Sequence, residues 1–267
     1  MRLLIRSRAF AAAGLPVVVA GAILWGQWGS GGGQGAAGPA LPLAGKTVVL
    51  DPGHNPGNVA HPNEIHQLVD IGNGRKACNT TGTATKAGYT EAAYNLDVAR
   101  RARVILRAEG ATVVLTQDGD RPWGPCVTER AAFANRAHAD ATVAIHADGA
   151  PAPGYGFHVI VPAVVVAGAA DTRPIVGPSR RLGVALRAAF GSVTGEAHAT
   201  YLGHGTGLVV RGDLGGLNLS RVPAVFIECG NMGNPTDARK MTTGAWRELA
   251  ATGIAAGVTS YLLHPDS

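Results

Sequence analysis

The stretch TVVLDPGH, residues 47–54, joins a short β-branched run to a turn-forming sequence. β-Branched residues favour strands, and Asp-Pro-Gly favours a tight turn, so we expect a strand over residues 47–50 that ends before His54. In an open α/β sheet, ligands bind beyond the carboxyl ends of the strands. The pattern therefore places His54 at the edge of a sheet where a functional site is expected.

Helical and extended patterns alternate along the chain that follows this strand. The clearest helix is expected over Glu91–Ala108, because Thr90 can cap its first turn and apolar residues recur at helical spacing. Alternating strands and helices predict one α/β domain with a mostly parallel sheet and helices on both faces. The other expected helices cover 128–137, 179–190 and 244–262, and the other expected strands cover 112–116, 141–146, 156–166, 208–211 and 224–228.

The N-terminal residues differ in composition from the rest of the chain. Three arginines precede an apolar run that ends near Trp25, a pattern typical of an export signal. The run of about 17 residues is at the lower limit of a membrane-spanning helix. We therefore expect either a signal peptide or a signal anchor over residues 1–28. A linker rich in Gly, Ala and Pro is expected over 29–45, and a single folded domain over 46–263.

The formal net charge of +5 does not indicate nucleic-acid binding. Arg2, Arg6 and Arg8 account for three of these charges, and residues 1–40 contain no acid, which leaves +2 for the rest of the chain. A charge this small on about 220 residues is too weak to attract a polyanion. We expect no nucleic-acid partner, and a membrane contact only through the N-terminal segment if that segment is not cleaved.

Four side chains that can bind metal or transfer protons are expected at the carboxyl edge of the sheet. His54, His146 and Glu228 each end or follow a predicted strand. Glu91 begins the helix that crosses back over the sheet, so it starts at the same edge, although the helix dipole alone also favours an acid there. Two imidazoles with one carboxylate form a common catalytic zinc set, and a further carboxylate can move protons. We predict His54, Glu91 and His146 as zinc ligands and Glu228 as the catalytic base and acid.

The order and spacing of these residues resemble the N-acetylmuramoyl-L-alanine amidase family 3 over residues 46–263. The resemblance implies a six-stranded sheet, one zinc ion held by two histidines and a glutamate, and a separate catalytic glutamate. It implies hydrolysis of the amide bond between the lactyl group of N-acetylmuramic acid and L-alanine in peptidoglycan or its muropeptide fragments. It rests on the run at 48–54, Glu91 with Asn95, residues 116–120, Arg130 with Asn135, 139–140 leading to 145–148, and 223–230 with Asn234.

An amidase of this kind is expected outside the cytoplasm. We predict an exported monomer in the periplasm or cell wall, either secreted or anchored by its N-terminal segment. Two other functions remain open: a wall-binding domain without catalysis, and a zinc carboxypeptidase that acts on stem peptides. A carboxypeptidase needs a cation for the free carboxylate of its substrate, for which Arg211 or Arg130 could serve, although Arg130 is more easily a structural residue. The sequence assigns no substrate-binding residue.

The long segment at 55–89 begins after one predicted ligand and ends before another. It shows no evident regular structure, and we expect it to form a wall of the substrate cleft. In an exported protein, Cys78 within it and Cys126 in a later loop can form a disulfide. Cys229 falls in a buried strand and is expected to remain an inert thiol. Asn95 and Asp148 are candidates for orienting the ligands.

Overall fold

The computed structural model describes residues 40–266. The predicted export signal at 1–28 and most of the predicted linker at 29–45 lie outside this range. The last linker residues pack on the domain, because Leu43 is buried in its main core and donates its backbone N–H to the Glu109 carbonyl at 2.8 Å. Within the described range, none of the helices combines the length and the apolar character needed to span a membrane.

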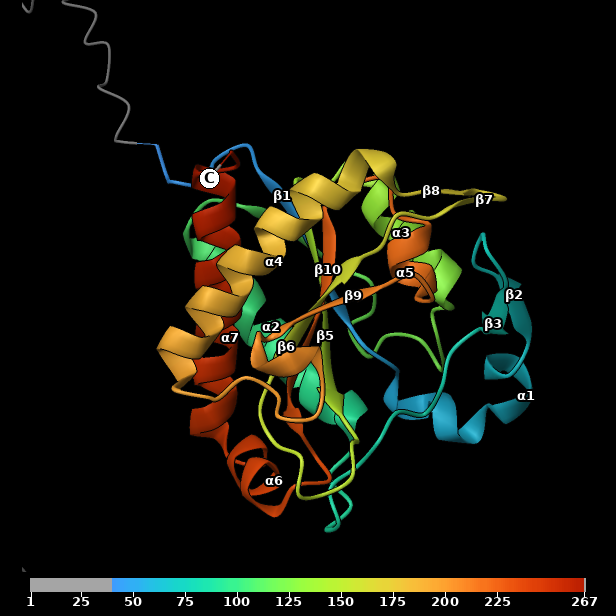
Figure 1. Cartoon of the computed structure of the whole chain (residues 1–267), viewed down its shortest axis with the longest axis vertical. Coiled ribbons are helices and arrows are strands. Elements are labelled where there is room, and N and C mark those ends of the chain that lie inside the picture. The colour runs from blue at the N-terminus through green and yellow to red at the C-terminus, as the bar shows by residue number, and fades with distance from the viewer. Residues whose placement is uncertain (1–39, 267) are drawn as a thin grey trace, which may run out of the picture. The chain divides into compact units, whose positions relative to one another are not determined.

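A six-stranded sheet forms the centre of the domain (Figure 1). Its strand order is β4-β1-β5-β10-β6-β9, and the first four of these strands run parallel to one another. β6 pairs antiparallel with β10, and β9 runs parallel to β6, so the sheet is mostly parallel, as predicted. The strands are β1 (Thr47–Pro52), β4 (Thr112–Leu115), β5 (Ala141–Asp148), β6 (His158–Pro162), β9 (Leu208–Arg211) and β10 (Ala224–Asn231).

Helices cover both faces of the sheet, which confirms the predicted fold class. On one face, three long helices pack together over the largest hydrophobic cluster (Figure 1). On the other face, α3 and α5 lie over two smaller clusters, and pockets open beside them. The long helices are α2 (Glu91–Ala108), α4 (Arg173–Thr194) and α7 (Gly244–Leu263); the others are α3 (Val127–Arg136), α5 (Gly215–Asn218) and α6 (Pro235–Met241).

Helix α4 begins earlier than the sequence predicted. The expected start at residue 179 followed two prolines, which usually interrupt helices. Pro174 lies in the first turn, where backbone N–H groups have no helical partner, so the residue costs little there. Pro178 lies inside the helix, and burial of Ile175 helps to hold the preceding turn against the domain. The strand expected within 156–166 is β6, and a small hairpin of β7 (Val166–Ala167) and β8 (Ala170–Asp171) follows it.

The segment at 55–89 contains regular structure that the sequence did not indicate. A strand of three residues is too short to show a clear alternation of polar and apolar side chains. The prediction that this segment has no regular structure was wrong. It contains a 3-10 turn, η1 (Pro56–Ala60), one helical turn, α1 (Pro62–Ile65), and a hairpin of β2 (Leu68–Asp70) and β3 (Arg75–Ala77).

The cysteines pair as predicted. Cys78, just after β3, forms a disulfide with Cys126, which precedes α3. The bond ties the segment at 55–89 to the helix-covered part of the domain. Cys229 is free and buried in β10, and burial raises the pKa of its thiol well above the usual range, so it is an inert thiol as expected.

Candidate metal centre

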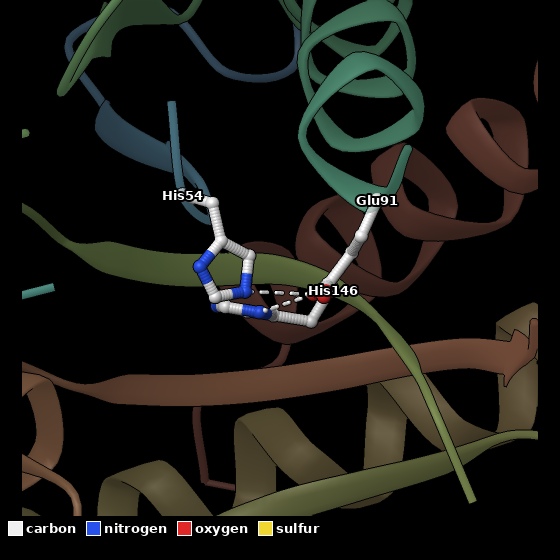
Figure 2. A group of neighbouring side chains, drawn as sticks. All are labelled: His54, Glu91 and His146. Atoms are coloured by element: carbon white, nitrogen blue, oxygen red, sulfur yellow. Dashed lines mark hydrogen bonds and ion pairs between the residues drawn. The ribbon is translucent and has the colours of Figure 1, made fainter. Parts of the chain in front are cut away.

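Three of the predicted site residues meet where β1, α2 and β5 approach one another. Figure 2 shows His54, Glu91 and His146 with their polar atoms directed toward a common point. One ligand atom from each residue lies within 4.8 Å of the other two. The three residues come from positions far apart in the sequence, and the parallel arrangement of β1 and β5 brings them together. This cluster could hold a metal ion.

Glu91 lies at the centre of the cluster. Its Oε1 is 2.9 Å from His146 Nδ1 and 3.1 Å from His54 Nε2. Burial raises the pKa of Glu91, but hydrogen bonds from the two imidazoles outweigh burial and hold the pKa well below its usual range. Backbone N–H groups of Thr83 and Ala147 also donate to the carboxylate, at 2.9 and 3.3 Å. The carboxylate is therefore anionic, as a metal ligand must be.

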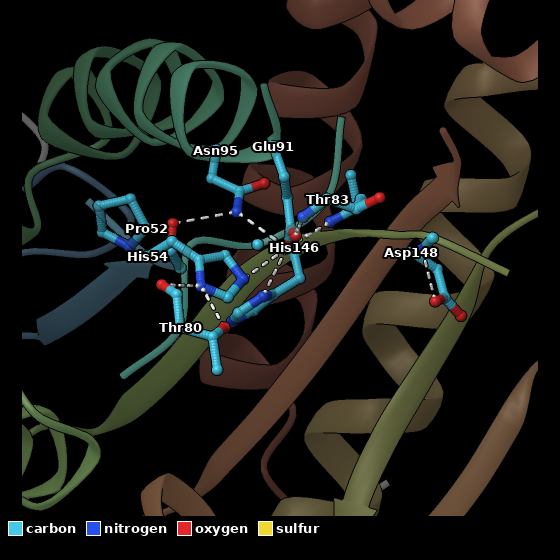
Figure 3. Close-up of polar contacts among 12 residues, drawn as sticks. Pro52, His54, Thr80, Thr83, Glu91, Asn95, His146 and Asp148 are labelled. Atoms are coloured by element: carbon cyan, nitrogen blue, oxygen red, sulfur yellow. Dashed lines mark hydrogen bonds and ion pairs between the residues drawn. The ribbon is translucent and has the colours of Figure 1, made fainter. Parts of the chain in front are cut away.

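His54 is oriented by Thr80. The Nδ1 of His54 lies 3.0 Å from the Thr80 carbonyl oxygen, which can only accept a hydrogen bond. Nδ1 therefore carries a proton, which leaves Nε2, the atom that faces Glu91, as the nitrogen that could bind a metal ion. Figure 3 shows this contact together with the hydrogen bonds to Glu91.

The backbone of His54 adopts an unusual conformation. Its φ of 62° lies in the left-handed region, which costs a residue with a side chain about 1 kcal/mol or more. Arg130 holds this turn by donating to the carbonyls of His54 and Pro52, both at 2.7 Å. Arg130 is itself buried in an ion pair with Asp51. Arg130 is thus a structural residue, as expected, and its guanidinium is engaged with the turn that carries His54.

Glycines allow the cluster to close. A Cβ atom at Gly53 would lie 2.1 Å from His146 Cε1, and a Cβ at Gly82 would lie 2.6 Å from His54 Cδ2. Neither distance is sterically possible without moving an imidazole. The two backbone positions therefore have to be glycine for the histidines to occupy their observed places.

The two residues expected to orient ligands behave differently. Asn95 donates to the Gly53 carbonyl at 3.1 Å and to Glu91 Oε1 at 3.4 Å, as expected of a positioning residue. Asp148 lies apart from the cluster in Figure 3, and its carboxylate accepts the N–H of Gly149. Asp148 lines the same pocket as the cluster, and no hydrogen bond joins its side chain to His54, Glu91 or His146, so its part in orienting a ligand stays a prediction.

Glu228 lies next to the cluster on the neighbouring strand. It pairs in register with His146 across β10 and β5. Its Oε2 is buried and has no hydrogen-bond partner among the described residues. Burial, together with the charges of Glu91 and Asp148, raises the pKa of Glu228 well above its usual range. Glu228 as a whole is half-buried, but a carboxylate oxygen buried without a partner is costly, so this arrangement indicates a functional group.

His146 and Glu228 project from the sheet face that α3 and α5 partly cover, whereas Glu91 and Asn95 come from helix α2. The His146 ring stacks on Phe226, with centroids 5.0 Å apart, and Glu228 follows Phe226 by two residues on the same strand. Side chains two residues apart on a strand share a face. The site therefore lies on a face of the sheet near its carboxyl edge rather than wholly beyond that edge.

Two pockets meet at the cluster. One, of about 270 Å³, contains the cluster and Glu228, and we name it the Glu228 pocket. The other, of about 310 Å³, lies against the β2–β3 hairpin, and we name it the hairpin pocket. Thr80 lines both, so the segment at 55–89 forms part of the cleft wall, as predicted. Thr80 and Thr83 were missed by the sequence analysis because a threonine in a long loop gives no sign of such contacts. Thr83 donates its backbone N–H to Glu91, and Thr80 contacts His54 with both its carbonyl oxygen and its hydroxyl.

The chain is similar in sequence to known amidases. The sequence model of the N-acetylmuramoyl-L-alanine amidase family matches residues 48–260. The chain is 38% identical over 221 residues to the N-acetylmuramoyl-L-alanine amidase Rv3717 of Mycobacterium tuberculosis, an alignment that covers 82% of this chain and 88% of that protein.

The fold is similar to that of solved amidase structures. The N-acetylmuramyl-L-alanine amidase Ami1 of Mycobacterium smegmatis superposes with a TM-score of 0.75 at 40% identity, covering 82% of this chain and 98% of the other. Ami1 of Mycobacterium abscessus gives a TM-score of 0.75 at 39% identity, covering 82% and 99%. Both similarities extend over most of the described domain.

Proposed function

This chain belongs to the N-acetylmuramoyl-L-alanine amidase family, and we propose that it is a zinc enzyme that remodels the cell wall or turns over its fragments. The bond cleaved is the amide between the lactyl group of N-acetylmuramic acid and L-alanine of the stem peptide. His54, Glu91 and His146 are the proposed ligands of one ion, and Glu228 is the proposed catalytic residue. The observation that carries the proposal is the unpartnered carboxylate of Glu228 beside the His-Glu-His cluster.

The donor set fits zinc. Zinc accepts imidazole nitrogen and carboxylate oxygen at about 2.0–2.2 Å, so two ligand atoms of a tetrahedral site lie roughly 3.4 Å apart. Glu91 Oε1 lies 2.9 and 3.1 Å from the nearest nitrogens of His146 and His54, close to that separation. Three protein ligands leave one position free for water or substrate, as in catalytic zinc sites.

The chain's own groups have distinct parts in the reaction. When bound, the ion would act as a Lewis acid that polarises the scissile carbonyl and lowers the pKa of water. Glu228 accepts a proton from the attacking water and later gives it to the leaving amine, which its raised pKa favours. Phe226 fixes the plane of the His146 ring by stacking on it. Thr80 and Asn95 hold His54 and Glu91 in their bound orientations.

The substrate places the enzyme outside the cytoplasm. We propose that residues 1–28 export the chain as a signal peptide or anchor it to the membrane, that 29–45 form a linker, and that 46–263 form the zinc amidase catalytic domain. The protein then acts as a monomer in the periplasm or cell wall, either secreted or anchored. The family name, N-acetylmuramoyl-L-alanine amidase, refers to a bond found in peptidoglycan, and this supports the proposed location.

Mass spectrometry of digested muropeptides tests the proposed reaction. An amidase releases the intact stem peptide from the glycan, and this is the expected result. Release of a single terminal amino acid would show a carboxypeptidase, and release of nothing in the presence of zinc would show a binding domain. The Glu228→Gln variant is the matched control, because it keeps the proposed ligands and removes the proton carrier.

A further inference from the structure

The two pockets beside the cluster differ in chemistry. The Glu228 pocket contains Glu228, Asp148 and Arg211, whereas the hairpin pocket contains none of these three. The hairpin pocket has an apolar wall that includes Ala77 and Val127. The pockets share His54, Thr80, His146, Leu214 and Phe226. Because the shared residues include two proposed ligands, the scissile carbonyl is expected at the junction, with one half of the substrate in each pocket.

The position of Glu228 indicates which half of the substrate each pocket binds. In amide hydrolysis, water adds to the carbonyl carbon, the C–N bond breaks, and a proton is delivered to the departing nitrogen. Glu228 delivers that proton in the proposed mechanism, and it lines only one of the two pockets. The amine half of the substrate, which is the stem peptide, therefore extends into the Glu228 pocket. The acyl half, which carries the lactyl group and the sugar, extends into the hairpin pocket.

Arg211 is the single lysine or arginine among the described residues that line the Glu228 pocket. It shares a sheet face with the site, since it lies two residues beyond Val209 on β9 and Val209 packs with Phe226. The Arg211 guanidinium donates two hydrogen bonds to Asp213, from Nε to Oδ1 at 2.8 Å and from Nη2 to Oδ2 at 2.7 Å. The other terminal nitrogen of Arg211 makes no hydrogen bond to any described residue.

Apart from Arg211 and the two histidines, the ionisable side chains of the Glu228 pocket are acids. The carboxylates of Glu91, Asp148 and Glu228 all line it. The ion proposed at the cluster offsets part of this negative charge, and away from it Arg211 is the side chain of this pocket that can offer a positive charge to a peptide carboxylate. Arginine suits this task because its planar fork of N–H groups matches a carboxylate, and the Asp213 pair fixes the fork in place.

We propose that Arg211 binds a carboxylate of the stem peptide on the amine side of the scissile bond and selects acidic stems. This inference rests on the proposed amidase function and on the placement of the stem peptide in the Glu228 pocket. Arg211 is then a specificity-determining residue. If Arg211 only balanced the charges of Glu228 and Asp148, its replacement would lower kcat/KM equally for all substrates. Experiment can therefore separate the two roles.

Two synthetic substrates test the inference: N-acetylmuramoyl-L-alanyl-D-glutamate and its diamide, in which both carboxylates are replaced by carboxamides. The wild-type enzyme is expected to prefer the glutamate form. Arg211→Gln should lower kcat/KM for the glutamate form by about tenfold to hundredfold, mainly through KM, because a charge-assisted hydrogen bond is lost. The same variant should change kcat/KM for the diamide by less than about threefold. Arg211→Lys should fall between wild type and Arg211→Gln on the glutamate form.

Arg173→Gln is the matched control. Like Arg211, Arg173 donates two hydrogen bonds to an aspartate two residues away, from Nε and Nη2 to Asp171 at 2.9 and 2.7 Å. Arg173 lines neither pocket. Its variant should behave like wild type on both substrates. Melting temperature and zinc content, measured for each variant, show whether the fold and the metal site are retained.

The outcomes separate the inference from the proposed function. Equal losses on both substrates in Arg211→Gln, or no preference for the glutamate form in wild type, would overturn the role of Arg211 and leave the amidase intact. If the zinc-loaded wild-type enzyme cleaved neither substrate nor any muropeptide at the lactyl amide, the proposed function would fall, and the inference with it.

Discussion

Glu228 occupies an environment that is costly for a carboxylate. Its Oε2 is buried without a partner in the described part of the chain, and two other carboxylates lie near enough to raise its pKa further. A replacement that removed the charge and kept the shape would relieve this cost. The residue is therefore better explained by chemistry than by stability, as is common for buried groups at catalytic sites.

We predict that Glu228→Gln keeps zinc and loses activity by about a hundredfold or more, because the proton carrier is removed while the ligands remain. The variant should also melt at the same temperature as wild type or higher, since an unpartnered carboxylate is removed. Steady-state kinetics, metal analysis and thermal unfolding check these outcomes. Loss of zinc in this variant would instead identify Glu228 as a ligand.

At the scale of elements, the long segment at 55–89 is held to the domain at several points. The disulfide from Cys78 to Cys126 fixes one point, and the Asn73 side chain donates to the Gly212 carbonyl at 2.7 Å to fix another. Lys76 pairs with Asp213 at 2.7 Å across the hairpin pocket. The disulfide joins the segment to the start of α3, and the other two links join the β2–β3 hairpin to the loop before α5, so the cleft wall depends on contacts between segments far apart in sequence.

We predict that the double variant Cys78→Ser/Cys126→Ser melts at a lower temperature and keeps zinc. A loop of this length restricts the unfolded chain by roughly 4 kcal/mol in the chain-entropy model, whereas the ligands lie on β1, α2 and β5. Thermal unfolding and metal analysis check both points. Reductant should lower the melting temperature of wild type to that of the variant and leave the variant unchanged. Free thiols at both positions in protein from an oxidising compartment would contradict the pairing.

Helices α2 and α7 are joined by an ion pair between Asp97 and Arg247. Burial raises the pKa of Asp97, but hydrogen bonds from Arg247 and Arg101 outweigh it and lower the pKa. A carboxyl with a depressed folded-state pKa stabilises the protein above its unfolded value and loses that contribution as pH falls through the folded value. We therefore predict that Asp97→Asn is less stable than wild type at neutral pH, and that the difference shrinks below about pH 4.

Denaturant unfolding at several pH values measures this difference. Arg247→Gln removes the partner of the same carboxylate and should reduce the effect of Asp97→Asn when the two are combined. A difference between wild type and Asp97→Asn that stays constant from neutral pH to about pH 2 would contradict the role assigned to the ionised carboxylate.

At the scale of the whole molecule, the cluster of His54, Glu91 and His146 joins the centre of the sheet to the helix layer. β1 and β5 are neighbouring strands, and α2 belongs to the layer that packs over them. A ligand that binds only the folded state stabilises it by mass action, at about 2.7 kcal/mol when its concentration is a hundred times the Kd. Removal of zinc is therefore expected to lower both the activity and the stability of the whole domain.

We predict that a chelator abolishes hydrolysis, that added zinc restores it, and that zinc raises the melting temperature. His146→Ala should show neither the activity nor the increase, because it removes one ligand and leaves β5 in place. Activity assays and thermal unfolding with and without zinc measure both effects. Full activity in protein shown to be free of metal would contradict the proposed mechanism.

Sequence alone determined the features that depend on local pattern. The β-branched run before His54, the capped helix that begins at Glu91, and the order of strands and helices were sufficient for the fold class. They also brought the two histidines, Glu91 and Glu228 to one edge of the sheet, because the ends of parallel strands meet there. The pairing of Cys78 with Cys126 followed from the context of an exported protein.

Tertiary structure alone decided which groups complete the site. Thr80 contacts His54 through its backbone carbonyl and its hydroxyl, and nothing in the sequence shows that this loop residue lies beside His54. Arg211 lies on β9, which runs opposite to the main strands, and its place in the Glu228 pocket follows from that pairing. The buried environment of Glu228 depends on Asp148 and other residues distant in sequence. Local periodicity specifies elements, but desolvation and charge at a site arise only from how those elements pack.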